Sequence, residues 1–425
     1  MTQISRRHFI GIGTAGAALL AAPTLRAQAA ARVVIVGGGF GGATVARMLR
    51  RIAPAIHVML VERDRVFVTC PFSNAVLGGL RDLDSIKFGY DGLVSAGVDV
   101  IHAEATGIDP VAQQVRLGDG TTLDFDRLVL APGIQLRWDA IEGYDEAASA
   151  IMPHAWLAGA QTTLLRSQLE AMDDGGLVVI AVPDNPFRCP PGPYERASLI
   201  AHYLKTHKPR SKLMILDAKE AFSKQALFQE AWAALYPDLI EWVPASASGE
   251  VIGVDTATMT VRTPFEDVTA AVVNVIPPQR AGRIAIDLGL DAGRGFCPVN
   301  PRTFESTVVA GIHLVGDAII GGAMPKSGFS ANSQAKACAF AIAALLDGED
   351  VADPVLLNTC YSAVAPDYGF SVAGAYRPDA DGAAIVAVEG AGGTSPVGAG
   401  ADVRRAEYAY GESWYANITN EMFGA

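Results

Sequence analysis

A glycine-rich turn between an apolar strand and an alanine-rich helix is the feature that most constrains this chain. In "ARVVIVGGGFGGATVARML" (31–49) the spaced glycines are Gly37, Gly39 and Gly42. In a dinucleotide-binding unit, the first makes the tight turn, the second lets the backbone approach a pyrophosphate, and the third lets helix pack on strand. The positive end of the helix dipole then faces the phosphates. The stretch predicts an α/β domain that binds a dinucleotide. A glycine turn without a ligand is the alternative.

An acidic residue at the end of the next predicted strand supports the nucleotide interpretation. The strand is "HVMLVER" (57–63), and Glu62 stands 20 residues after Gly42. A carboxylate at this distance hydrogen-bonds a ribose hydroxyl. We therefore expect Glu62, with the adjacent Arg63, to hold the nucleotide half of the cofactor, which the patterns described next indicate to be FAD.

Two later strands end in patterns that two-domain flavin disulfide reductases share. The stretch 124–133 ends in Pro132-Gly133, and 311–318 contains Gly316-Asp317. In those enzymes the Gly-Asp carboxylate binds the ribityl and phosphate region of the flavin. The fold class expected is therefore α/β, with two Rossmann-like FAD/NAD(P)-binding domains and a smaller C-terminal domain. The FAD-binding domain would comprise 30–142 and 282–350.

The insert, 143–281, has strand–helix alternation of its own. An apolar strand (177–182) precedes a helix (194–205) and a second strand (212–217) that ends in Asp217. Between strand and helix, "FRCPPGPYERA" (187–197) places Cys189 among prolines where a phosphate-binding loop would carry glycines. Proline lacks a backbone N–H, so this loop cannot offer a row of amides to a pyrophosphate. We expect a central NAD-binding-like domain without a nicotinamide nucleotide site.

The first 29 residues are typical of a twin-arginine export signal. Ser5-Arg6-Arg7 opens the segment, a mildly apolar run follows, and Ala27-Gln28-Ala29 fits a small-residue cleavage site. A membrane anchor is the alternative, but the run is too short to span a bilayer. We therefore predict a periplasmic protein with no membrane span after cleavage. The formal net charge of −12 disfavours nucleic acid as a partner.

The C-terminal region, 351–425, differs in composition from the rest. A loop rich in Gly, Ala and Pro (389–401) precedes a tail rich in aromatic residues (406–424). The tail is interpreted as a helix packed on the body. It could also build a protein interface, where such residues are enriched.

The five cysteines contain no C-x-x-C pair, so neither a structural zinc site nor a c-type haem is expected on this chain. Cys70 follows Glu62 closely enough to reach toward a flavin ring, although a core thiol is equally compatible with the residues. Cys338, in an alanine-rich helix, is expected to be a packing residue. Cys297 has no evident role.

Several motifs together resemble the flavoprotein subunit of flavocytochrome c sulfide dehydrogenase. They are "GGGFGGATVA", "VTCPFSN", "IKFGYDGL", "FRCPPGPYERAS", "IPPQRAG", "MPKSGFSANSQ" and "LNTCYS". The resemblance implies that Cys70 carries FAD through a thioether to the 8α-methyl group. It also implies that Cys189 and Cys360 form a redox-active pair over the flavin, and that a separate haem c subunit or cytochrome c takes the electrons.

That resemblance suggests a chemistry in which hydrosulfide attacks the cysteine pair and forms a persulfide. The helix following Cys189 would lower the pKa of its thiol. Glu195, in the first turn, either complements the helix dipole or accepts the proton of sulfide. Lys326 either stabilises reduced flavin or is a surface lysine. The alternatives are a flavoprotein of the thiosulfate-oxidising (Sox) system, a sulfide:quinone oxidoreductase, and a non-catalytic flavin-binding subunit.

Overall fold

The glycine turn joins the first strand of a parallel sheet to a helix in the computed structural model of the chain, which describes residues 30–424. The predicted twin-arginine signal, 1–29, lies outside the described residues. The strand order is β19-β9-β1-β2-β5, and all neighbours are parallel. The strands are β1 (Arg32–Val36), β2 (His57–Val61), β5 (Asp99–Ile101), β9 (Arg127–Leu130) and β19 (Ile312–Leu314). Strands β1, β2 and β9 are apolar runs because both faces of the sheet are covered.

This first sheet is built from two separate parts of the chain. Strand β19 follows the central insert and pairs with β9. Helices α1 (Phe40–Ile52) and α8 (Gly328–Asp347) likewise come from the two parts and pack on each other. The nucleotide sheet is thus interrupted and then resumed.

The central insert forms a second parallel sheet, with the order β13-β12-β11-β17. Its strands are β11 (Leu177–Val182), β12 (Lys212–Asp217), β13 (Ile240–Val243) and β17 (Val272–Val275). Its helices are α4 (Ala160–Ala171), α5 (Gly192–His207) and α6 (Gln225–Leu235). Strands β11 and β12 have the predicted bounds, whereas α5 begins two residues earlier and ends two residues later than predicted.

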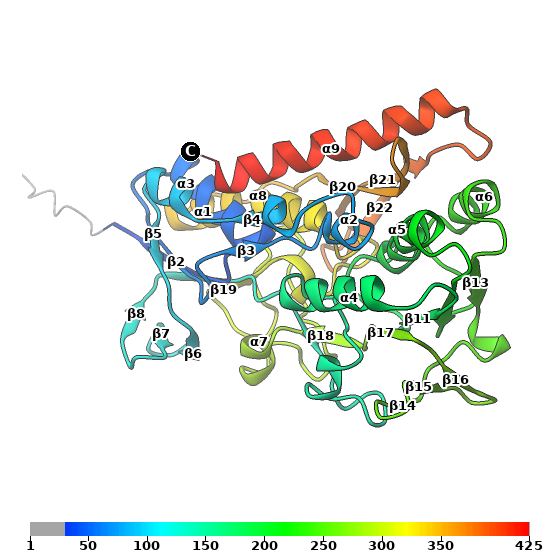
Figure 1. Cartoon of the computed structure of the whole chain (residues 1–425). Coiled ribbons are helices and arrows are strands. Elements are labelled where there is room, and N and C mark those ends of the chain that lie inside the picture. Colours follow the sequence, from blue (N-terminus) through cyan, green and yellow to red (C-terminus); the bar gives the residue numbers. More distant parts are fainter. Residues whose placement is uncertain (1–29, 425) are drawn as a thin grey trace, which may run out of the picture. The chain divides into compact units, whose positions relative to one another are not determined.

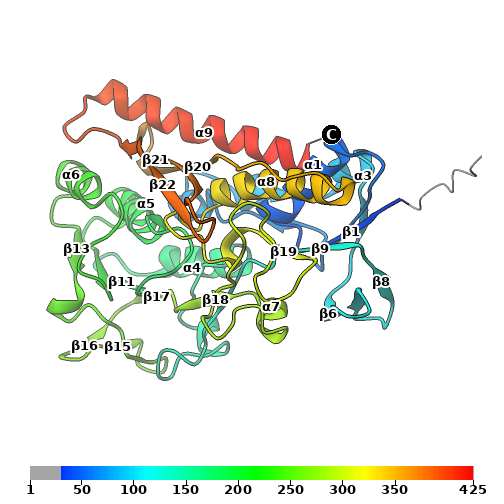
Figure 2. The same ribbon diagram turned by 180° about the vertical axis from the view of Figure 1, so that it is seen from behind.

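A three-stranded antiparallel sheet follows, made of β20 (Leu356–Ala365), β21 (Tyr368–Pro378) and β22 (Ile385–Thr394). Strand β20 contacts both α5 and α8, and Figure 2 shows it between them. Helix α9 (Ala401–Phe423) lies along β20, β21 and α1 (Figure 1). It buries Tyr415, Met422 and Phe423, so the prediction of a packed C-terminal helix is confirmed. The interface role of this region stays a prediction.

Short elements complete the described chain. They are β3 (Phe67–Val68), α2 (Ser73–Leu77), β4 (Lys87–Phe88), α3 (Asp91–Ser95), β6 (Ala105–Asp109), β7 (Gln114–Leu117), β8 (Thr122–Asp124), β10 (Ile134–Leu136), β14 (Gly253–Asp255), β15 (Thr260–Arg262), β16 (Asp267–Thr269), β18 (Gln279–Ala281) and α7 (Arg283–Asp287). Cys297 and Cys338 are fully buried in the main hydrophobic core. Between residues 30 and 424, no helix is both long and apolar enough to cross a membrane.

Candidate functional site

Three cysteines from three distant parts of the sequence line one cavity. Cys70 follows β3, Cys189 precedes α5, and Cys360 lies within β20. Each is partly exposed, unlike Cys297 and Cys338. The structure therefore separates the five cysteines into three that face a cavity and two in the core. All are free thiols here, so the disulfide between Cys189 and Cys360 stays a prediction.

The segment that carries Cys70 is held by the C-terminal helix. The hydroxyl of Thr69 hydrogen-bonds that of Tyr415 on α9 at 2.7 Å, and the Cys70 thiol donates to the Trp156 carbonyl at 3.6 Å. The ring of Phe72 lies 4.5 Å from that of Tyr415. Helix α9 thus fixes one wall of the cavity, and the core-thiol alternative for Cys70 is wrong.

The loop that carries Cys189 uses its few backbone amides internally. The Cys189 N–H donates to the Lys326 carbonyl at 2.8 Å, and the Gly192 N–H donates to the Cys189 carbonyl at 2.8 Å. Cys189 itself has a φ of +58°, in the left-handed region. This turn aims a side chain, rather than a row of amides, at the space before α5.

The expected low pKa of the Cys189 thiol is wrong. Burial raises its pKa, and the nearby Cys360 and Glu195 add to the effect because a thiolate would meet their negative charges. The cations Arg188 and Lys224 act in the opposite direction. Helix α5 begins at Gly192, three residues beyond the thiol.

Glu195 lies in the first turn of α5 and lines the same cavity. Its Oε2 accepts from Asn74 Nδ2 at 2.9 Å, and its Oε1 accepts from the Ala363 N–H at 3.0 Å. Burial raises the pKa of this carboxyl. A carboxyl with a raised pKa binds a proton more readily than a surface glutamate does, which favours the proton-acceptor interpretation over a helix-dipole role alone.

Sequence reasoning missed a buried guanidinium beside Glu195. Arg196 is 2% exposed and lines the cavity. It donates to Asn74 Oδ1, to Asn274 Oδ1 and to the carbonyls of His154 and Ala155 at 2.6–3.0 Å. All these acceptors are neutral, so Arg196 contributes a positive charge to the cavity wall, and the nearest carboxyl acting on it is that of Glu195. The sequence signal that could have indicated this role is an arginine directly after Glu195, on an otherwise apolar face of the helix.

The glycine turn is as tight as its sequence predicts. Gly37 has a φ of +100°, and a Cβ there would lie 2.4 Å from the Ala131 carbonyl oxygen. A Cβ on Gly42 would lie 1.8 Å from the Gly37 carbonyl oxygen. Gly39 immediately precedes α1. Only glycine fits at positions 37 and 42 without a shift of the backbone.

Glu62 and Arg63, predicted together, have different surroundings. Glu62 Oε2 accepts from the Gly38 N–H at 2.7 Å, so this carboxylate lies at the glycine turn. The Arg63 side chain is 68% exposed and pairs with Asp64. The structure therefore brings Glu62 to the turn, and gives Arg63 no contact with it.

The predicted residues after β9 and β19 also carry features of a flavin cradle. Gly133 and Gly316 both have positive φ, and Pro132 packs closely against Gly282. Asp317 has a buried Oδ1 that lacks a hydrogen-bond partner among the described residues. A hydroxyl of a bound ribityl chain would satisfy this oxygen. Together with the glycine turn, this orphaned acceptor fits FAD.

Lys326 is not a surface lysine. Its Nζ donates to the carbonyls of Asp317 and Ile319 at 3.0 and 2.5 Å, and lies 3.7 Å from the ring centroid of Phe296. Burial lowers its pKa to about 8. The residue is therefore a partly buried cation beside Asp317 and beside the loop of Cys189.

In the central domain, the carboxylate at the end of β12 is bound by other side chains of the same domain. Asp217 is fully buried. Its Oδ2 accepts from the Tyr194 hydroxyl at 2.6 Å and from Trp242 Nε1 at 2.9 Å, and its Oδ1 pairs with Lys219 at 2.5 Å. An acid at this place would bind the ribose of a dinucleotide, but these three side chains cover it.

Three protein families match successive parts of the chain. "Pyridine nucleotide-disulphide oxidoreductase" matches residues 31–156. "Sulfide dehydrogenase (flavocytochrome c) flavoprotein chain, central" matches 162–277. "Flavocytochrome c sulphide dehydrogenase, flavin-binding" matches 352–423. The cavity lies where residues of all three segments meet.

Similar proteins agree with these matches. The sulfide dehydrogenase (flavocytochrome c) flavoprotein chain of Chlorobaculum thiosulfatiphilum is 67% identical over 45 residues, covering 11% of this chain and 94% of that sequence. The sulfide-quinone reductase of Aquifex aeolicus is 29% identical over 185 residues, covering 43% of this chain but only 42% of that protein.

Solved structures show the same fold. The sulfide:quinone oxidoreductase of Aquifex aeolicus has a TM-score of 0.71 at 19% identity, with 92% of each chain covered. The ferredoxin reductase of the CYP199A2 system from Rhodopseudomonas palustris has a TM-score of 0.64 at 17% identity, covering 81% of this chain and 82% of that one. With the family matches and the high identity to the Chlorobaculum chain, the conclusion is direct: this chain belongs to the family of the flavoprotein chain of flavocytochrome c sulfide dehydrogenase.

Proposed function

We propose that the chain is an exported FAD enzyme that oxidises sulfide to sulfur or polysulfide and passes the electrons to a cytochrome c. One observation carries this proposal. Cys70, Cys189 and Cys360 come from the three family segments and line one cavity, with Glu195 in its wall. The proposed nucleophile acceptor, proton acceptor and point of covalent attachment would therefore share one space.

FAD would be held at both ends by residues that fit it. Gly37, Gly42 and Glu62 form the nucleotide turn, and Asp317 has an oxygen free for the ribityl chain. Cys70 would form the thioether to the ring. When bound, FAD supplies an acceptor that takes two electrons at once and releases them singly.

The cysteine pair would react directly with sulfide. Hydrosulfide attacks one sulfur of the Cys189–Cys360 disulfide. A new sulfur–sulfur bond forms, the disulfide bond breaks, and a persulfide and a thiolate result. The sulfide sulfur is thereby oxidised, and the two electrons reside on the thiolate until the flavin accepts them. Arg196, which contacts only neutral acceptors, favours the entry of an anion into this cavity.

Glu195 would take the proton of the attacking hydrosulfide. Its two oxygens are fixed by hydrogen bonds from the Asn74 side chain and from the Ala363 N–H of β20. Burial raises the pKa of the carboxyl, so that it binds a proton more readily than a surface glutamate does.

A nicotinamide nucleotide is an unsuitable electron acceptor for this chain. The loop before α5 uses its amides internally, and Asp217 is covered by Tyr194 and Trp242. We therefore propose a separate cytochrome c subunit or soluble cytochrome c as the acceptor, with the region of α9 as its docking candidate. The predicted twin-arginine signal would place both proteins in the periplasm.

Anaerobic addition of sulfide tests the enzyme proposal. The visible absorbance of bound flavin should bleach within seconds in wild type. Cys360→Ser should bind flavin and fail to bleach, whereas Cys338→Ser, in the core, should bleach as wild type does. Bleaching in Cys360→Ser would exclude the disulfide mechanism. No bleaching in wild type would favour a non-catalytic flavin-binding subunit.

A further inference from the structure

Asn74, on α2, is hydrogen-bonded to the start of α5 on the other side of the cavity. Its Nδ2 donates to Glu195 Oε2 at 2.9 Å and to the Gly192 carbonyl at 3.2 Å, and its Oδ1 accepts from Arg196 Nε at 3.0 Å. The side chain is 7% exposed and lines the cavity. Because a guanidinium can only donate, Arg196 fixes which end of the amide is the oxygen. The NH₂ group of Asn74 therefore faces Glu195.

The start of α5 also packs against the sulfur of Cys189. A Cβ built on Gly192, the first residue of α5, would lie 2.9 Å from this sulfur. The Gly192 N–H donates to the Cys189 carbonyl at 2.8 Å. The amide of Asn74 thus binds both the residue on which the Cys189 sulfur packs and the carboxyl of Glu195, and it holds the two on one turn of the chain.

The position of Asn74 depends in turn on the segment of Cys70. Ser73, the residue directly before Asn74, donates to the Cys70 carbonyl through its N–H at 3.1 Å and through its Oγ at 2.7 Å. These bonds join the start of α2 to Cys70. A single side chain therefore connects the predicted attachment point of the flavin with the predicted proton acceptor.

Both oxygens of the Glu195 carboxyl accept hydrogen bonds from N–H groups. Oε2 accepts from Asn74, and Oε1 accepts from the Ala363 N–H at 3.0 Å. Hydrogen bonds donated to a carboxylate favour its ionised form. Burial acts in the opposite direction and raises the pKa of this carboxyl. Asn74 thus counteracts burial and keeps the group in the form that can accept a proton.

Three other charged or titratable groups face the Glu195 carboxyl. Arg196 on α5 and Lys224, just before α6, favour its ionised form, and Cys189 faces it from the loop before α5. Lys224 Nζ donates elsewhere, to the Cys360 carbonyl at 2.8 Å and to Ser362 Oγ at 2.7 Å. Within residues 30–424, the direct donors to the carboxyl are the Asn74 amide and the Ala363 N–H. Of these two, only the Asn74 donor can be removed by substitution.

We propose that Asn74 is a positioning residue for proton transfer: it holds the Glu195 carboxylate on the turn that packs against Cys189, where it accepts the proton of the attacking hydrosulfide. This inference rests on the proposed function. Hydrosulfide forms a sulfur–sulfur bond with one cysteine of the pair, and the disulfide bond breaks. The S–H bond then breaks, and its proton converts the Glu195 carboxylate to a carboxylic acid. The electron pair of the S–H bond stays on the outer sulfur of the persulfide.

The pH dependence of flavin reduction tests this role. The rate at which sulfide bleaches the holoenzyme is measured anaerobically by stopped flow, in wild type and in Asn74→Leu, between about pH 6 and pH 9. The ratio of the two rates cancels the ionisation of sulfide itself. Without the Asn74 donor, the pKa of Glu195 should rise by about one unit. The rate of the variant relative to wild type should therefore fall about tenfold from high to low pH.

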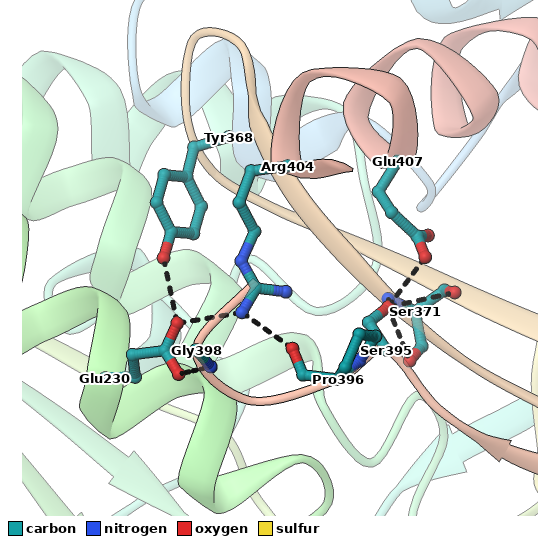
Figure 3. A network of polar contacts seen from close by, with 8 residues as sticks. All are labelled: Glu230, Tyr368, Ser371, Ser395, Pro396, Gly398, Arg404 and Glu407. Carbon is teal, nitrogen blue, oxygen red and sulfur yellow. Dashed lines mark hydrogen bonds and ion pairs between the residues drawn. The ribbon is translucent and has the colours of Figure 1, made fainter. Parts of the chain in front are cut away.

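Two controls separate proton transfer from structure. In a Glu195→Gln background, Asn74→Leu should change the residual rate by the same factor at every pH, because no carboxyl remains to titrate. Glu230→Gln removes a contact between distant segments outside the residues that line the cavity, since Glu230 accepts from Arg404 Nη2 at 2.8 Å and from the Gly398 N–H at 2.7 Å (Figure 3). This variant should match wild type at every pH.

A ratio of Asn74→Leu to wild type that is constant over pH would show a purely structural role and overturn the inference. Asn74→Asp keeps an acceptor for Arg196 and removes the donor, so it should show the same fall if Asn74→Leu does not fold. A constant ratio in Asn74→Asp would overturn the inference by itself. Failure of the proposed function appears differently, as the absence of bleaching in wild type.

Discussion

The buried side chain of His154 makes the stability of the folded protein depend on pH. Its ring Nδ1 accepts from the Trp156 N–H at 2.9 Å, and its carbonyl accepts from Arg196. The side chain is buried, and burial together with the charges of Arg196 and Arg188 lowers its pKa from 6.5 to about 3. The folded protein therefore holds this histidine neutral, whereas the unfolded chain protonates it below pH 6.5.

The sign and size of the effect follow from that difference. The stability due to neutral His154 is fully present above pH 6.5 and is lost as the pH falls toward 3, because only the unfolded state binds the proton. Between pH 8 and pH 5 the unfolding free energy should fall by about 2 kcal/mol from this residue, since one pH unit corresponds to about 1.4 kcal/mol.

Urea unfolding of the holoenzyme, followed by tryptophan fluorescence, measures this loss. His154→Asn is the matched variant, because an amide oxygen can accept the Trp156 N–H without titrating. Its unfolding free energy should fall by about 2 kcal/mol less than that of wild type over the same pH range. Another buried histidine, His313, contributes equally to both proteins and cancels in the difference. Parallel pH profiles for the two proteins would refute the reasoning.

Three other substitutions test separate parts of the site. Gly37→Ala should abolish flavin binding and destabilise the protein by about 1–3 kcal/mol, because the added Cβ would meet the Ala131 carbonyl. Flavin content measures the binding and urea unfolding measures the stability. A variant that is yellow and as stable as wild type would contradict the prediction. Cys70→Ser should release its flavin on acid precipitation whereas wild type retains the colour; free FAD from wild type would exclude the thioether. Tyr415→Phe should lower the free energy of unfolding by about 1 kcal/mol, because it removes the hydrogen bond to Thr69. An unchanged urea midpoint would show that this bond contributes nothing to stability.

Much of the fold could be predicted because local sequence dictates it. The apolar runs at 177–182 and 212–217 became β11 and β12 with their predicted bounds. Gly37 and Gly42 occupy positions where a Cβ would lie less than 2.5 Å from a carbonyl oxygen. The approach of Gly42 to Gly37 involves neighbouring residues, so a single sequence displays it, whereas the approach of Gly37 to Ala131 appears only in the fold.

The charges of the site could not be predicted in the same way. The pKa of Cys189 is raised by burial in a cavity whose walls come from segments far away in the sequence. Lys224 lies 136 residues from Cys360, and nothing in its own stretch distinguishes it from a surface lysine. Arg63, in contrast, lies next to Glu62 but points to solvent with Asp64. The predicted contact of Arg63 with FAD stays a prediction.

The covering of Asp217 has a consequence for protein engineering. Replacing the prolines around Cys189 by glycines would restore a loop with amides, yet the acid needed for a ribose would remain bound by Tyr194, Trp242 and Lys219. Tyr194 also stacks on Phe222 with ring centroids 3.7 Å apart, so that releasing the carboxylate would disturb the packing of the domain. A change of electron carrier toward nicotinamide would therefore require two separate sets of substitutions, neither of which confers a benefit alone.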